Sequence, residues 1–249
     1  MLSMRIVRLL SLELLTFVFC TAMAFAAEGD FILKGEKAFL IKSGKKTLVK
    51  DCITQSVRTD AGIRSWILVD AKDVEGAESG IYLFMGKENR PAGFLPIKEE
   101  VSSCDVVFSP SGEKLLISRN KDTGYIKLVS LYFLDKNKGL VKKASFEMMG
   151  LPVWIDYHRF VFTSVDSTKK VCSENQCTPW NSVALYDSAV EDLIFLKKAT
   201  ATAVYTFLKY DKENDSVEIY ESSVRNEKDW YDEDKIRYTT FTLPIPAAG

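Results

Sequence analysis

Residues 104–120 read "CDVVFSPSGEKLLISRN", two apolar runs separated by a short polar segment. Pro110 presets the backbone angle φ for a tight turn, and Gly112 accepts the positive φ needed before the second run. Short apolar runs bounded by turn residues are typical of β-strands. The stretch therefore predicts a β-hairpin.

The same pattern continues along the chain beyond Gly29. The apolar runs are short, partly alternating and rich in Val, Ile, Phe and Tyr, as in "SWILVDAKD" (65–73), "GIYLFMG" (80–86) and "IKLVSLYFL" (126–134). Many short strands separated by turns are typical of β-sandwiches, β-barrels and β-propellers. We therefore expect an all-β fold.

The predicted strands recur at a nearly constant interval. The strands that follow the first turn of each unit are centred at Leu68, Leu116, Val161 and Thr206. The last strands of the units are centred at Leu95, Ser145, Ile194 and Thr240. A third series, less regular at its last step, runs through Leu83, Leu131, Leu185 and Ile219. The period is about 47 residues, and a four-stranded propeller blade occupies roughly 40–50.

This period favours a small β-propeller of about five four-stranded blades. The first unit, 30–51, has room for three strands, and no first-strand hairpin precedes "AVYTFLKYD" (203–211). We expect these two incomplete units to complete each other by closing the ring. The alternative is a large, irregular β-sandwich in which the repeat is accidental.

The segment "FSPSGEKLLISRN" resembles the repeat of TolB-type, WD40-like bacterial propellers. The matching residues are Phe108, Ser109, Pro110, Gly112, Lys114 and Leu115, with Ser111 in place of the commoner Asp. The segments "IDYHRFVFTS" (155–164) and "VRTDAGIRSWILVD" (57–70) look like looser copies. The resemblance implies a propeller that makes protein–protein contacts, and it does not identify the partner.

The N-terminal segment has the order of a secretory signal peptide. Arg5 and Arg8 precede an apolar run, Leu14 to Ala26, that ends in the small-x-small sequence Ala24-Phe25-Ala26. Glu13 interrupts the start of the run, which is shorter than the about 20 residues that span a bilayer. We expect a signal peptide at 1–26, a single propeller-like domain at 27–249, no membrane span after cleavage, and a periplasmic or secreted location.

The charges of the chain are balanced. Lys and Arg total 33, Asp and Glu total 34, and the net charge is −1. Nucleic-acid binding needs a clustered positive surface. We therefore expect no nucleic-acid partner.

Four cysteines follow the predicted signal peptide: Cys52, Cys104, Cys172 and Cys177. An even number in an exported chain indicates disulfides. Proximity in sequence pairs Cys172 with Cys177, which leaves Cys52 with Cys104; in a propeller this second bond would join adjacent blades. The alternative is that some are free, buried thiols. The spacings differ from those of zinc sites, and we expect no metal and no cofactor.

Trp154, Asp156 and His158, the one histidine of the chain, alternate in sequence and would share a face of a strand. They suggest a binding spot or a carboxylate-supported base. We favour the alternative, in which His158 is a turn residue bonded to the backbone. No G-x-S-x-G elbow marks a serine for a catalytic triad.

Two further segments have residues that could form binding sites on the surface. "CSENQCTPW" (172–180) is either a recognition loop that presents Trp180 or a stapled loop whose Trp180 returns to the core. "RNEKDWYDEDKIRY" (225–238) carries Trp230 and Tyr231 among charges. It is either a sugar-stacking platform or a solvated loop between the last two strands, and we favour the loop.

The chain has no phosphate-binding loop, dinucleotide fingerprint or CxxC redox motif, which lowers the expectation of an enzyme. We expect an exported, non-catalytic binding or scaffolding module, monomeric, that contacts another envelope or extracellular protein through its loops. The competing hypothesis is a glycan-binding lectin or a glycoside hydrolase on a small propeller. A structural protein without a binding site is the third.

Overall fold

The structure is a computed structural model. It describes residues 30–34, 37–42, 44–49, 53–69, 79–85, 91–96, 104–120, 125–135, 139–172 and 177–247. These residues form seventeen strands and two short 3-10 helices, with no α-helix among them. None of the helices in these ranges is long and apolar enough to cross a bilayer. The predicted all-β class is confirmed.

The strands form four antiparallel sheets. The first contains β1 (Asp30–Lys34), β2 (Lys37–Lys42) and β3 (Lys45–Leu48). The second contains β4 (Ile53–Thr59), β5 (Gly62–Val69), β6 (Gly80–Met85) and β7 (Pro91–Pro96). The third contains β8 (Cys104–Phe108), β9 (Lys114–Asn120), β10 (Ile126–Asp135), β11 (Gly139–Trp154), β12 (Arg159–Cys172), β13 (Cys177–Asp187) and β14 (Asp192–Lys197). The fourth contains β15 (Ala203–Asp211), β16 (Ser216–Ser223) and β17 (Arg237–Pro244).

The seven-stranded third sheet holds two repeat units that share β11. Met148 and Met149 pair with β10 on one side and with β12 on the other. The long strand therefore ends one meander, β8–β11, and begins the next, β11–β14.

The strand series predicted from the sequence occupy equivalent places in successive units. Leu68, Leu116 and Val161 lie in β5, β9 and β12, the second strand of each unit. Thr206 lies in β15, which starts a three-stranded sheet, as expected from the absent first strand. The first unit also has three strands.

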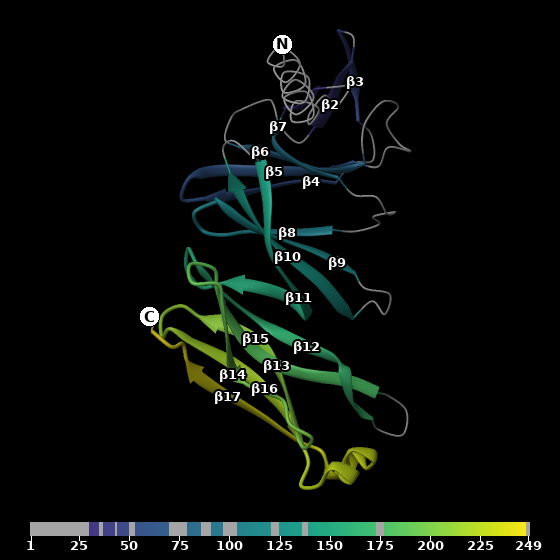
Figure 1. Ribbon diagram of the computed structural model, residues 1–249, viewed down its shortest axis with the longest axis vertical. Coiled ribbons are helices and arrows are strands. Elements are labelled where there is room, and N and C mark those ends of the chain that lie inside the picture. Colours follow the sequence, from purple (N-terminus) through teal and green to yellow (C-terminus); the bar gives the residue numbers. More distant parts are fainter. Residues whose placement is uncertain are drawn as a thin grey trace, which may run out of the picture.

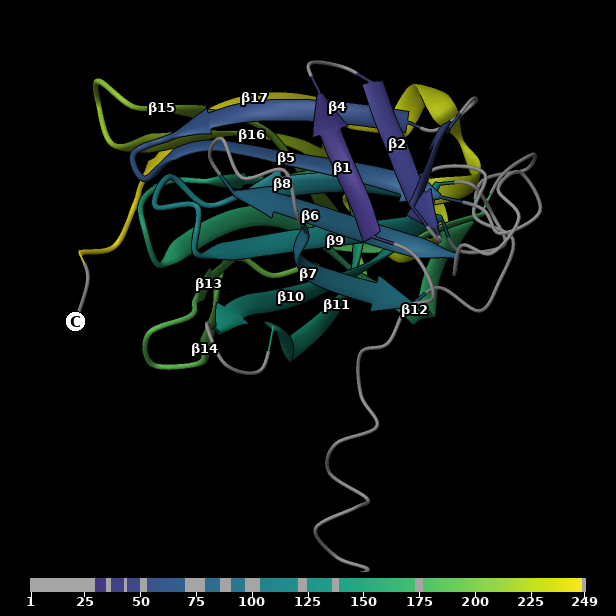
Figure 2. The same ribbon diagram turned by 90° about the horizontal axis from the view of Figure 1, so that it is seen from above.

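Neighbouring repeat units stack face to face along the long axis of the molecule (Figure 1), and they lie one behind another when viewed along it (Figure 2). The inner units therefore bury both faces of their strands. In β9, Leu115 and Ile117 join a core with β5 and β6, whereas Leu116 joins a core with β12 and β13. A strand buried on both faces favours apolar residues at consecutive positions, which explains the unbroken run "LLI" (115–117) in β9.

The expected ring closure is not found in the described residues. The first and last sheets lie at opposite ends of the long axis, and neither contributes a strand to the other (Figure 1). Each hydrophobic core joins one unit only to its neighbours along the chain. The contacts that stack the sheets therefore do not bring the last unit back to the first.

Candidate functional site

The six residues singled out in the sequence fall at two opposite ends of the strands. Trp154, Asp156 and His158 lie at the connection between β11 and β12, at the left of Figure 1. Trp180 lies near the start of β13, and Trp230 and Tyr231 lie in the first 3-10 helix, η1 (Glu227–Tyr231). The structure does not bring the two groups together.

Asp156 shapes the β11–β12 turn. Its Oδ1 accepts hydrogen bonds from the backbone N–H groups of His158 and Arg159, both at 2.7 Å, and its Oδ2 contacts Arg159 Nε at 2.6 Å. Partial burial alone would raise the pKa of Asp156, but these three donors outweigh it and hold the pKa below its usual value of 3.8. The carboxylate is thus occupied by the turn itself.

His158 joins a buried cation. Lys114 Nζ lies 2.7 Å from His158 Nδ1, 2.9 Å from Ser188 Oγ and 3.2 Å from the Tyr157 carbonyl. Because an ammonium group only donates, Nδ1 is the accepting nitrogen of the ring. The Ser188 hydroxyl donates to the His158 carbonyl at 2.7 Å. With Asp156 bonded to the backbone, these residues do not form a Ser-His-Asp triad.

Burial lowers the pKa of Lys114 despite the opposing charges of Asp187, Glu113 and Asp156. The residue is only 7% exposed. A buried ammonium group is tolerated when acceptors surround it, and here three of them do. The arrangement is that of a structural cation between two units.

Basic residues make equivalent contacts at two other junctions between units. The buried Arg64, in β5, donates from Nε to the Gly112 carbonyl at 3.1 Å. Arg159, at the start of β12, donates from Nη1 to the carbonyl of Pro246, beyond β17. We call Arg64, Lys114 and Arg159 the basic braces, because each one begins or nearly begins the second strand of a unit and bonds to the next unit.

Trp154 is also engaged in packing. Its indole Nε1 donates to the Val107 carbonyl at 3.3 Å, and its ring meets the edge of Phe160 at a centroid distance of 5.0 Å. The end of the molecule that carries Trp154, Asp156 and His158 is therefore held together by side chains that a ligand would have to displace.

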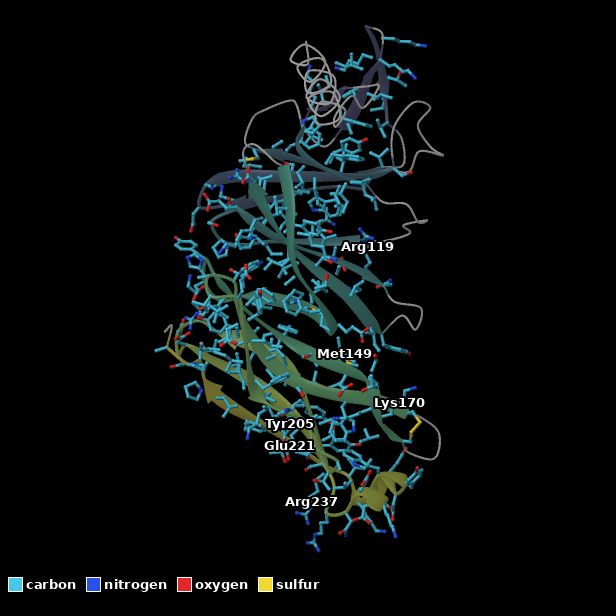
Figure 3. The ribbon with its side chains drawn as sticks, viewed as in Figure 1. Arg119, Met149, Lys170, Tyr205, Glu221 and Arg237 are labelled. Carbon is cyan, nitrogen blue, oxygen red and sulfur yellow. A yellow bond between two sulfur atoms is a disulfide. The ribbon has the colours of Figure 1, made fainter. Side chains whose placement is uncertain are left out.

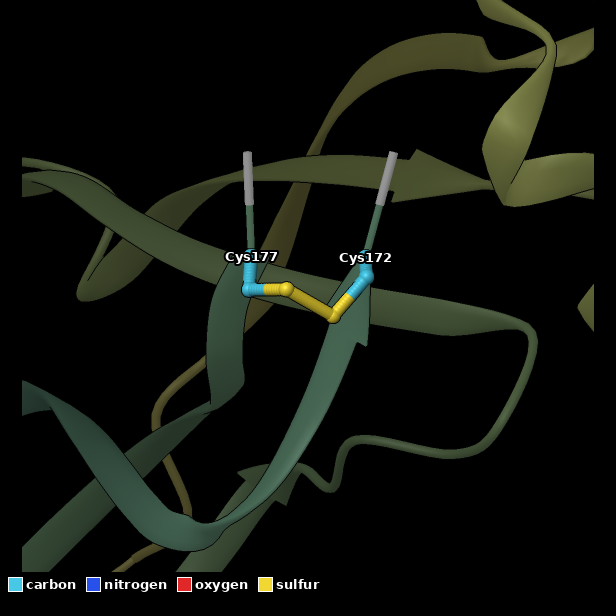
Figure 4. The surroundings of a disulfide bond; sticks show 2 residues. All are labelled: Cys172 and Cys177. Carbon is cyan, nitrogen blue, oxygen red and sulfur yellow. A yellow bond between two sulfur atoms is a disulfide. The ribbon is translucent and has the colours of Figure 1, made fainter. Parts of the chain in front are cut away.

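The other end of the strands carries the disulfide. Cys172 and Cys177 close the β12–β13 hairpin and are bonded (Figure 4), which confirms the predicted pair. The predicted Cys52–Cys104 bond involves side chains outside the described residues.

Trp180 and Trp230 pack beside this disulfide. Trp230 is 5% exposed, donates from Nε1 to the Ala201 carbonyl at 2.8 Å, and shares a core with Val204 and Val224. Trp180 is partly buried against that core, and Lys169 Nζ lies 4.9 Å from its ring centroid. Tyr231 is 58% exposed. The segment 225–238 thus connects the last two strands, as expected, but it is folded into 3-10 turns around a buried tryptophan.

An open pocket of about 460 Å³ lies at this end, between the disulfide hairpin and the last sheet. Its volume lies within the range of about 300–1,000 Å³ typical of ligand pockets. Met149, labelled in Figure 3 toward the same edge as Lys170 and the disulfide, forms part of the wall. Val204, Trp230 and Ile236 supply apolar surface, and the exposed Tyr125 and Tyr238 also line it.

Asn181, in β13, gives this pocket a polar group without a partner. It is 3% exposed, and its Nδ2 lies 3.8 Å from the weakly accepting Met149 Sδ. Its Oδ1 has no hydrogen-bond partner among the described residues. Native proteins pair nearly all buried polar atoms, and an unpaired one costs about 1–3 kcal/mol.

The sequence reasoning missed Asn181, Tyr125, Tyr238 and the braces Arg64 and Arg159. The sequence does contain a signal for Asn181. In the alternation along β13 it falls on the same face as Val183 and Leu185, which face β15 and β16. A polar residue at an inward-facing strand position needs a partner. No cluster of His, Cys, Asp or Glu in the described ranges could hold a metal ion.

Comparison with known proteins gives no family. No family model matches the chain, and no curated protein matches it. Among solved structures, "Crystal structure of the eukaryotic initiation factor" is similar, with a TM-score of 0.35 and 11% sequence identity. The match covers 89% of this chain and 66% of that one, and at this TM-score we draw no conclusion from it.

Proposed function

We propose that the protein is an exported, non-catalytic binding module that takes a segment of a partner protein into the pocket beside the Cys172–Cys177 disulfide. In this proposal the repeat units are propeller-type blades of the TolB-like kind, five in number and arranged as an open arc. The partner is another protein of the envelope or the extracellular space.

The observation that carries the proposal is a pocket with aromatic walls that is lined by Asn181, whose buried Oδ1 has no partner among the described residues. Rotation of the Asn181 side chain would turn this oxygen toward an N–H or O–H donor of a ligand, while the apolar part of the ligand would cover Trp230 and Ile236. Pockets that bind specifically combine apolar walls with a few placed polar groups in this way. A peptide side chain such as an amide or a hydroxyl next to an apolar residue meets both requirements.

Two further observations support export and a non-catalytic role. A disulfide persists in an oxidising compartment, which agrees with the predicted signal peptide. At the β11–β12 turn, the acid, the histidine and the buried lysine bond to one another, to Ser188 or to the backbone. These groups serve the fold, which favours a binding module over a hydrolase.

The glycan hypothesis remains the second candidate, and one observation favours it. Tyr125 and Tyr238 line the pocket with 76% and 59% of their surface exposed. Exposed aromatic rings beside a polar group also suit the apolar face of a sugar ring.

The test is to select peptides from a displayed random library on the mature protein and to measure their affinities for variants. We expect Asn181→Leu and Tyr238→Ala each to weaken peptide binding at least tenfold. Tyr231→Ala is the matched control, because Tyr231 is as exposed as Tyr238 but does not line the pocket. Asn181→Leu should also stabilise the fold by about 1–3 kcal/mol, since it removes an unpaired buried oxygen.

The combination of weaker binding and higher stability excludes misfolding as the cause. Peptide binding that is unaffected by both pocket substitutions would contradict the proposal. A glycan array probed with the unchanged protein and the same three variants gives the alternative outcome. Binding of sugars but of no peptide, lost on Tyr238→Ala, would establish the glycan hypothesis instead.

A further inference from the structure

The seven-stranded sheet ends in an apolar edge. Its last strand, β14, pairs with β13 on one side, and no strand of the described chain pairs with its other side. Leu193, Ile194 and Phe195 are exposed by 37%, 37% and 40%, although all three are large and apolar. An exposed apolar edge strand is a template for pairing with another chain.

Among the other outer strands, β3, β7 and β17 carry features that usually prevent such pairing, whereas the apolar centres of β1, β8 and β15 are buried or half-buried. β3 contains two lysines in its four residues, "KKTL". β7 begins with Pro91 and ends with Pro96. β17 begins with the charged Arg237. Charged residues and proline protect edges, whereas the centre of β14 has neither.

The charges around β14 indicate which strand would pair with its free edge. Glu191 and Asp192 precede the apolar residues, and Lys197 and Lys198 follow them. In an antiparallel pair of two identical strands, the acidic start of each copy meets the basic end of the other. The segment "EDLIFLKK" is therefore complementary to itself, which a segment adapted to a different protein need not be.

The register follows from the requirement that opposed residues share a face of the sheet. A two-fold axis through antiparallel strands places one residue opposite its own copy. With Ile194 at the axis, Leu193 lies opposite Phe195 of the second copy. The β14 irregularity between Phe195 and Lys197 adds one residue, so Asp192 at the start of one strand comes opposite Lys197 at the end of the other.

We propose that β14 is the interface of a two-fold homodimer, in which the sheets of two copies join edge to edge. The interface shares no residue with the pocket, so this proposal does not depend on the proposed function. It departs from the monomer expected from the sequence, in which the exposure of β14 was not visible.

The test is sedimentation analysis of the full mature chain over a concentration series. We expect the unchanged protein to dimerise, and Ile194→Lys to raise the dimer dissociation constant about 100-fold, because it sets two like charges opposite each other on the axis. Ile63→Lys is the matched control, since Ile63 is 44% exposed in β5, away from β14. It should leave the constant unchanged.

A charge exchange tests the register. Asp192→Lys should weaken the dimer about tenfold, because each copy then opposes a lysine to Lys197. Adding Lys197→Asp restores the complementarity in the reverse sense and should restore the dimer. A wild-type protein that stays monomeric up to its solubility limit would overturn the proposal. So would a double variant that dimerises no better than Asp192→Lys alone, with thermal unfolding showing all variants to be folded.

Discussion

At the scale of single residues, polar groups that suggested chemistry in the sequence mostly serve as connectors in the structure. Asp156 and His158 lie in a turn, as the favoured interpretation of the sequence had it, but the His158 ring bonds to the Lys114 side chain and not to the backbone. Trp154 and Trp230 each donate an indole N–H to a backbone carbonyl. Their bonds could not be predicted because the acceptors lie 47 and 29 residues away along the chain. The contribution of Asp156 to the stability of the fold is the most directly testable of these.

We predict that Asp156→Asn destabilises the protein at neutral pH and that the difference from wild type shrinks in acid. The folded-state pKa of Asp156 is depressed, so its contribution is fully present above its unfolded-state pKa of about 3.8. It is lost as the pH falls through the lower folded-state value. Urea unfolding of both proteins between pH 7 and pH 3 measures this gap, and a constant gap over that range would argue against the assignment.

At the scale of elements, the turn between β8 and β9 joins two sheets. Gly112 has φ +71°, and a Cβ there would lie 2.6 Å from Thr59 Oγ1 and 2.9 Å from Arg64 Nε. The Asp60 N–H donates to the Pro110 carbonyl at 2.8 Å across the same junction. The glycine is thus required both for its backbone angle and for the approach of the neighbouring unit.

Gly112→Ala should therefore destabilise the fold by about 2–4 kcal/mol, the sum of a left-handed alanine and the displacement of a buried, hydrogen-bonded arginine. Gly139→Ala is the control, because Gly139 has φ +68° but a Cβ added there would meet no described atom within 4 Å. It should cost only about 1 kcal/mol. Chemical denaturation compares the two, and equal losses would show that the close approach contributes nothing.

The elements themselves could be predicted well from the sequence. Apolar runs between turn residues located most of the strands, and the period placed Leu68, Leu116 and Val161 in equivalent strands, because both signals are local. The pocket could not be predicted. It depends on how β13 packs against β15 and β16, and the alternation of residues along a strand carries no information on that packing.

At the scale of the whole molecule, the stack is open. Ring closure was expected because two incomplete units could have completed each other, yet within the described residues each three-stranded end unit shares a core with one neighbour only. Whether stacked sheets curve into a ring depends on the angle between successive sheets. That angle is set by side-chain volumes in the shared cores, which the repeat period does not reveal.

The open stack predicts an elongated particle in solution. A compact domain of this length has a radius of gyration of about 17 Å. Small-angle X-ray scattering of the mature Ile194→Lys variant should give a clearly larger value, and this variant avoids the elongation that dimerisation would add. A value near 17 Å would instead indicate a closed ring.

The double burial of the inner sheets also bears on how the chain selects among alternative strand pairings as it folds. In a sheet with one solvent-exposed face, a register shift of one residue moves the apolar side chains from the core into water, so the shifted pairing is strongly destabilised. In β9 the same slip would only exchange Leu115 and Ile117 for Leu116 between two apolar layers. Hydrophobic burial discriminates weakly between these pairings, whereas Lys114 finds its three acceptors on one side alone. Loss of the basic braces should therefore produce chains with strands in the wrong register, in addition to lowering the stability of the correctly folded protein.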